Sequence, residues 1–166
     1  MTTKVKRSAK EGIGFGILAG LIFALVEIIA AAAMGNPVFG PFRMFASIVL
    51  GSAALQTVSL GTAIIVGSFV HVVLSGLFGL AYGLFNSRLS TETETSWSRQ
   101  VLLGLAFGGL VWLVNFQIIA RIAYPWFLNA PQFLQLVMHA LFFGVSLAIM
   151  YAAAARRVQH LPGVTA

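Results

Sequence analysis

Residues 16–37, GILAGLIFALVEIIAAAAMGNP, form an apolar run that contains one ionisable side chain, Glu27. A helix that crosses the hydrocarbon core of a membrane needs about 20 mostly apolar residues, and this run is long enough. The whole 166-residue chain has the same character, because 59% of it is hydrophobic, 8% is charged and the mean hydropathy is +0.95. Soluble domains contain about 25% charged residues. The sequence therefore predicts a protein embedded in a lipid bilayer.

Four stretches are long and apolar enough to span a membrane. They are residues 12–34, 62–86, 98–121 and 131–155. Residues 41–56 are also apolar and compatible with a helix, but about 16 residues are few for a span. We expect this segment to be an interfacial or re-entrant helix in the loop after the first span, and a fifth full span is the less favoured alternative. The predicted fold is all-α, a single membrane domain with a bundle of four transmembrane helices.

Lysine and arginine are distributed unevenly between the two sides of this bundle. Two of them, Arg43 and Arg121, flank one side. The other eight flank the side that carries both chain ends, and they are Lys4, Lys6, Arg7, Lys10, Arg88, Arg99, Arg156 and Arg157. Basic residues favour the cytoplasmic side of a membrane. The sequence therefore predicts an inner (plasma) membrane protein whose N-terminal segment 1–11 and C-terminal tail 156–166 are both cytoplasmic.

The first and third predicted spans resemble each other. A shift of 88 positions places residues 16–37 on residues 104–125, GLAFGGLVWLVNFQIIARIAYP, with six identities in 22 positions. Glu27 then falls on Asn115. The second span of each half carries a histidine followed by a glycine five residues later, in VHVVLSG and MHALFFG. The halves are therefore predicted to be two fused helical hairpins that form a parallel repeat, as in some transporters.

Each predicted span carries one conspicuous polar side chain, namely Glu27, His71, Asn115 or His139. At about 1.5 Å of rise per residue, all four fall in the outer half of the bilayer, within about two turns of each other. An ionisable group inside the membrane costs at least about 2.5 kcal/mol and normally faces the interior of the bundle, where it has a partner. We expect Glu27 to accept a hydrogen bond from a histidine or to be buried as the neutral acid.

This constellation is compatible with a cofactor. Two histidines from alternate helices can ligate haem b from opposite faces, and His71 and His139 are the candidate ligands. Glu27, His71 and His139 are also candidate ligands of a transition-metal ion, because imidazole and carboxylate groups suit such ions. A site without a cofactor is the simpler alternative, since polar side chains also hold membrane helices together. Three further residues are predicted to support the site by hydrogen bonds: Asn115, Ser75 and Gln135.

Three classes of function follow from these residues. The leading hypothesis is a small membrane protein with a His/Glu site that binds haem or a metal, for electron transfer or metal binding. The main alternative is a non-catalytic accessory subunit of a larger membrane complex, which would pack through faces such as Gly12–Gly16–Gly20 and Gly104–Gly108. A channel or transporter is the third class. The chain has no P-loop, HExxH or GxSxG motif, and this favours a role other than that of an enzyme.

The expected partners are the lipid bilayer and either further copies of the chain or other membrane subunits. The net charge of +6 is compatible with nucleic-acid binding, but the basic residues flank the spans, so no nucleic-acid partner is expected. The chain has no cysteine, which excludes disulfides and thiolate metal ligands.

Overall fold

The computed structural model describes residues 3–159, and of residues 3–7 only the backbone. In this part of the chain every regular element is a helix. The segments long and apolar enough to cross a membrane are Ser8–Ala33, Leu60–Asn86, Trp97–Ala123 and Gln132–Gln159. Each overlaps a predicted span, so the four-helix membrane fold is confirmed. Apolar side chains such as Ile65, Ile122 and Phe133 are 72%, 83% and 78% exposed, as expected of surfaces that face lipid.

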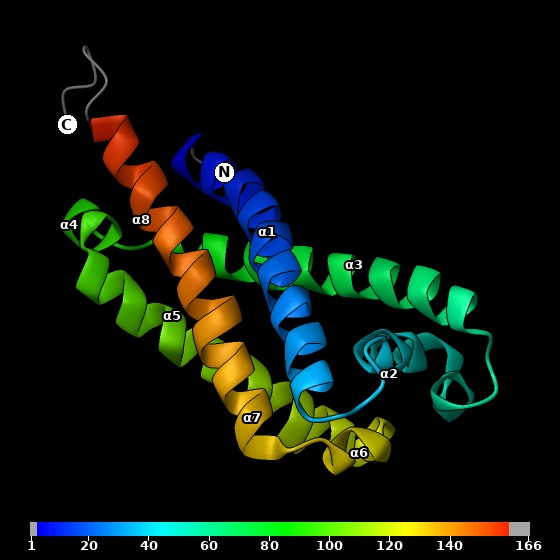
Figure 1. Ribbon diagram of the computed structural model, residues 1–166. Coiled ribbons are helices and arrows are strands. Elements are labelled where there is room, and N and C mark those ends of the chain that lie inside the picture. The colour runs from blue at the N-terminus through cyan, green and yellow to red at the C-terminus, as the bar shows by residue number, and fades with distance from the viewer. Residues whose placement is uncertain (1–2, 160–166) are drawn as a thin grey trace.

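The first hairpin pairs α1 (Thr3–Ala33) with α3 (Leu60–Asn86), as Figure 1 shows. Glycines let the two backbones meet, because Gly12 and Gly16 both face the backbone of Gly79. A side chain at Gly12 or Gly16 would collide with it. Small residues at such crossings are the usual means by which membrane helices approach closely.

The second hairpin has the same design, but both of its helices contain a π-helical segment. The first helix consists of α5 (Trp97–Trp112), the π-helical η2 (Leu113–Ile119) and α6 (Ala120–Ala123). After the 3-10 turn η3 (Pro125–Asn129), the second consists of α7 (Gln132–Val137), the π-helical η4 (Met138–Val145) and α8 (Ser146–Gln159). Gly104 faces the carbonyl of Gly144, and Gly108 faces that of His139. The glycine faces are thus used inside the two hairpins, not left open for another protein as the accessory-subunit hypothesis proposed.

The segment between α1 and α3 folds over one end of the bundle. It contains α2 (Gly40–Leu50), which packs against α3, and the 3-10 turn η1 (Ser52–Leu55). Gly51 separates them with a φ of +68°, a conformation that glycine adopts most readily, and this ends the helix. Residues 41–56 are therefore helical as predicted, but in two pieces. At 11 residues, α2 is too short to be a fifth span.

The two ends of the bundle differ. One, the terminal end, carries both ends of the described chain and the short helix α4 (Thr91–Thr95), and the other, the loop end, carries α2 and η3 (Figure 1). Buried hydrogen bonds join the hairpins at the terminal end. The Tyr82 hydroxyl donates to Oε1 of Gln100 at 2.8 Å, and the Tyr151 hydroxyl donates to the carbonyl of Ser8 at 2.6 Å. Since buried polar groups are costly when unpaired, these bonds help to close this end.

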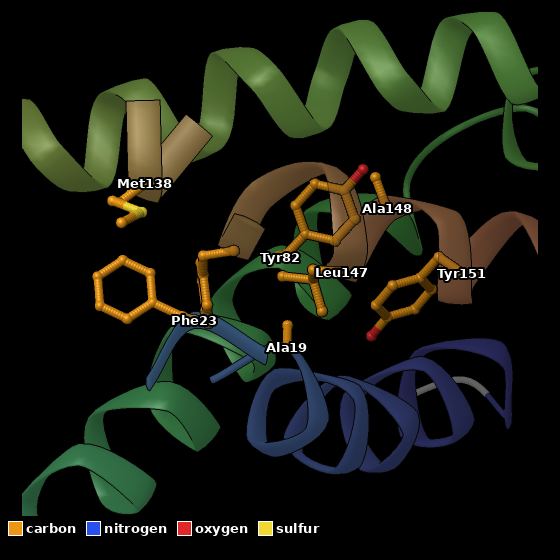
Figure 2. Packing of buried hydrophobic residues seen from close by; sticks show 8 residues of the cluster. Ala19, Phe23, Tyr82, Met138, Leu147, Ala148 and Tyr151 are labelled. Atoms are coloured by element: carbon orange, nitrogen blue, oxygen red, sulfur yellow. The ribbon is translucent and has the colours of Figure 1, made fainter. Parts of the chain in front are cut away.

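The apolar core lies between the hairpins. Figure 2 shows Phe23 of α1 beside Met138 of η4, and Leu147 of α8 beside Ala19 of α1. Ala19 and Leu147 are completely buried. The core continues toward the loop end, where Phe23 and Phe143 also line an open space among the described residues.

Candidate ligand-binding cavity

A cavity of about 590 Å³ lies at the loop end, between the two hairpins and against α2. Its wall includes the four polar residues that the sequence placed at one depth: Glu27, His71, Asn115 and His139. Ser75 and Gln135, the further residues predicted to support the site, line it as well. The tertiary structure therefore brings all six of these side chains to a single space, contributed by α1, α3, η2, α7 and η4.

Glu27 reaches from the first hairpin to the second. Nε2 of Gln135 donates a hydrogen bond to Oε1 of Glu27 at 2.9 Å. The donor is therefore a glutamine, and the expectation of a histidine donor was wrong. Among the described residues, the other carboxyl oxygen of Glu27 has no hydrogen-bond partner. Since a carboxylate can accept several hydrogen bonds, Glu27 keeps accepting capacity toward the cavity.

The ring of His71 is held on α3 by one hydrogen bond and two aromatic rings. Its Nε2 lies 2.8 Å from the carbonyl oxygen of Gly20. A carbonyl can only accept, so Nε2 is the protonated nitrogen and donates this bond, which leaves Nδ1 as an acceptor. The ring stacks on Phe45, with centroids 4.4 Å apart, and on Phe23, with centroids 5.8 Å apart. These contacts fix both the orientation and the tautomer of the ring.

His139 lies on η4 and is only 8% exposed. Its Nδ1 lies 2.7 Å from the carbonyl oxygen of Gln135. By the same reasoning Nδ1 is the donor, and Nε2 is left as an acceptor. The ring meets Phe23 and Phe116 edge-on, with centroid distances of 4.8 Å and 5.5 Å. Phe23 thus contacts both histidine rings, which is why the two polar side chains share one apolar surround.

Two of the four conspicuous polar residues of the cavity lie in π-helical segments. Asn115 is in η2 and His139 is in η4, and η4 is the segment that packs against α5. Such segments are rare and are often found at functional sites, because they change the direction of the side chains around them. Sequence reasoning missed them, since the apolar pattern of a span does not distinguish an α-helical turn from a π-helical one.

The helix α2 closes the cavity at the loop end. Met44, Phe45 and Ile48 of α2 line the cavity. Nε1 of Trp126 in η3 donates to Oγ of Ser47 at 2.8 Å, and this bond ties α2 to the second hairpin. The sequence showed an apolar helix here, but nothing in it indicated that the helix would form part of the site.

The structure does not assemble a ligand set for a metal ion. Among the described residues, no three histidine, aspartate or glutamate side chains are grouped closely enough to hold one. Glu27, His71 and His139 line one cavity without meeting at a common point. For haem, the free Nε2 of His139 is suitably presented, whereas Nε2 of His71 is engaged by the carbonyl of Gly20. The haem and metal sites therefore stay predictions.

Comparison with known proteins finds similarity along most of the membrane domain. A UPF0397 protein of Lactiplantibacillus plantarum is 30% identical over 146 residues, which cover 79% of this chain and 71% of that protein. No protein-family model matches the chain. No solved structure matches it.

Proposed function

The chain belongs to the UPF0397 family, and on that premise we propose that it is a multi-pass membrane protein that binds a small molecule between its two hairpins. The observation that carries this proposal is the cavity of about 590 Å³ that gathers Glu27, His71, Asn115 and His139. Small-molecule sites are typically cavities of about 300–1,000 Å³ with mostly apolar walls and a few convergent polar groups. The cavity has the size and the lining of such a site.

The same observation favours binding over a purely structural role for these residues. Protein interiors are close-packed, with few voids larger than a water molecule. Polar side chains that served only to hold helices together would be expected to bond one another across a closed interface. Instead, the free nitrogens of His71 and His139 and the second carboxyl oxygen of Glu27 have no partner among the described side chains.

Filling the cavity tests the proposal. Ala30 lines the cavity, whereas its neighbour Ala32 is exposed and does not. Purified wild type, Ala30→Phe and Ala32→Phe in lipid nanodiscs would each be equilibrated with a panel of small aromatic compounds and studied by native mass spectrometry. We expect adducts on the wild type and on Ala32→Phe, and a loss of at least tenfold in their abundance on Ala30→Phe. Equal adducts on Ala30→Phe and the wild type would place binding outside the cavity.

We also propose that the terminal end is cytoplasmic, so that the cavity lies near the outer face of the plasma membrane. The excess of lysine and arginine around the terminal end supports this orientation. Because the chain has no cysteine, a single introduced cysteine is a unique label site. A membrane-impermeant maleimide should label Val38→Cys, at the loop end, on intact cells. It should label Thr91→Cys, at the terminal end, only after the cells have been lysed. The reverse pattern would overturn the orientation.

Haem b, with His71 and His139 as its ligands, is a separate proposal for the occupant of this cavity. The hydrogen bond from Nδ1 of His139 to a carbonyl supports this, because such bonds orient imidazole ligands in metal and haem sites. A transition-metal ion is the related proposal, although Glu27, His71 and His139 are not grouped closely enough in this structure to hold one. A reduced-minus-oxidised spectrum with elemental analysis of the purified protein tests both. A spectrum without haem bands, together with a metal-free sample, would overturn them.

A further inference from the structure

Within the described chain, the cavity wall contains an acidic side chain but no lysine or arginine. Among the described residues that line it, Glu27 is the one acidic residue. The two arginines at the loop end, Arg43 and Arg121, form hydrogen bonds with other groups. Nη1 of Arg43 donates to the carbonyls of Ala54 and Val58 at 2.8 Å and 2.9 Å, and Nη2 of Arg121 donates to Gln117 at 2.8 Å. Glu27 therefore has no countercharge from these arginines.

The uncharged polar groups of the cavity add hydrogen-bond acceptors. His71 and His139 each use their protonated nitrogen on a backbone carbonyl, so each presents a lone pair on its other nitrogen. Among the described residues, the one buried side-chain nitrogen or oxygen without a hydrogen-bond partner is Nε1 of Trp112. The unbonded nitrogens of His71 and His139 are therefore not inaccessible. They are open to the space beside them. With the free oxygen of Glu27, these two nitrogens are three of the acceptors that the cavity offers to a ligand.

The apolar part of the wall is rich in aromatic rings. Phe23 and Phe45 enclose His71, Phe116 lies against His139, and Phe78 and Phe143 complete this side of the cavity. The face of an aromatic ring attracts cations electrostatically, and the effect increases when the cation is removed from water. A carboxylate, imidazole lone pairs and ring faces together favour a positively charged group that donates hydrogen bonds.

We propose that the ligand of this cavity is an organic cation with N–H donors, such as an ammonium or amidinium group, attached to an aromatic or apolar body. This inference rests on the proposed function, because it names the chemical class of the small molecule that the cavity binds. The cationic group lies at Glu27 and donates to it and to the histidine acceptors, while the body packs among the phenylalanine rings. The carboxylate of Glu27 gains the countercharge that a buried charge needs.

Three probes of nearly the same shape separate charge from size: 2-naphthamidine, a cation with N–H donors, 2-naphthamide, which is neutral, and 2-naphthoate, an anion. Their binding to the full-length protein would be measured by calorimetry in phosphatidylcholine nanodiscs, with empty nanodiscs subtracted so that partition into lipid does not count. We expect the amidine to bind the wild type at least tenfold more tightly than the amide, and the naphthoate to bind most weakly. This comparison needs no variant, so it stands even if a substitution impairs folding.

Glu27→Gln keeps the shape of the side chain and removes its charge. It should lower amidine affinity at least tenfold and leave amide affinity unchanged. Glu92→Gln is the matched control, because Glu92 is exposed on α4 at the terminal end, where it pairs with Arg99 at 2.7 Å. It should behave as the wild type.

The outcomes separate the two proposals. If the amide or the naphthoate binds as tightly as the amidine, and Ala30→Phe abolishes that binding, then the cavity binds ligands but the cationic class is wrong. If no probe binds the wild type, or if Ala30→Phe binds every probe as the wild type does, then the cationic ligand and the proposed cavity function both fail.

Discussion

Replacing Gly16 by alanine should force the two helices of the first hairpin apart. A Cβ atom at this position would lie 2.7 Å from the Cα of Gly79. Carbon atoms pack best at about 3.5–4.0 Å, so α1 and α3 would have to separate by about 1 Å. Overpacking of this kind costs about 1–3 kcal/mol, and alanine regains about 0.5–1 kcal/mol of helix propensity. We expect the free energy of unfolding to fall by up to about 2.5 kcal/mol, with a central value of about 1 kcal/mol.

The assay is reversible unfolding in mixed micelles with a rising fraction of SDS, followed by circular dichroism. Gly14→Ala is the matched control, because Gly14 is exposed on the same helix and a Cβ there would meet nothing within 4 Å. This control should be unchanged or up to about 1 kcal/mol more stable than the wild type. Equal free energies of unfolding for the two variants would refute the idea that the contact between Gly16 and Gly79 holds the hairpin together.

The same unfolding measurement can test two hydrogen bonds, one from Tyr82 to Gln100 and one from Trp126 to Ser47. Tyr82→Phe removes the hydroxyl that donates to Gln100 and should lower the free energy of unfolding by about 1–3 kcal/mol. The control is Tyr124→Phe, because the hydroxyl of Tyr124 makes no hydrogen bond with the described residues. This control should change the free energy of unfolding by less than about 0.5 kcal/mol. Trp126→Phe removes the donor to Ser47, and should cost about 0.5–1.5 kcal/mol and speed amide hydrogen exchange in α2. If Ser47→Ala costs as much in Trp126→Phe as it does in the wild type, the two side chains are not coupled and this bond does not hold α2 in place.

The glycine contacts also explain where the cavity lies. Gly16 meets Gly79 in the first hairpin, and Gly104 meets Gly144 in the second. The close contacts continue as far as the histidines, where Gly20 faces the side chain of Ser75 and Gly108 faces the carbonyl of His139. Helices that cross at a close contact diverge beyond it, and Figure 1 shows α3 leading away from the second hairpin toward the loop end. The space opened by this divergence is lined by the polar residues of the spans and covered by α2.

Several features of the fold could be predicted from the sequence because they depend on the solvent and not on packing. A bilayer requires about 20 apolar residues per span, so the four spans are visible in the chain. Glu27 and Asn115 could be placed at similar depth because depth follows from helix rise and the position of the loops. That both residues face one cavity agrees with the expectation that polar groups in a membrane point to the interior of the bundle.

What each polar group contacts was decided by the tertiary structure alone. Gln135 donates to Glu27 across 108 positions of the chain, and the carbonyl of Gly20 accepts a hydrogen bond from Nε2 of His71 across 51. Such pairings depend on how two hairpins rotate about their axes, and an apolar sequence leaves that rotation open because lipid accepts any apolar face.

The sequence by itself thus determined that this protein spans the membrane four times and that each span carries one polar group into the bundle, because insertion into lipid is set by length, polarity and charge. The cavity, its cover by α2 and the acceptor-rich lining were decided by the tertiary structure. The physical reason is that close packing at a few glycines fixes how the helices cross inside each hairpin, while contacts between the hairpins fix their relative placement, and both together determine which side chains share a space.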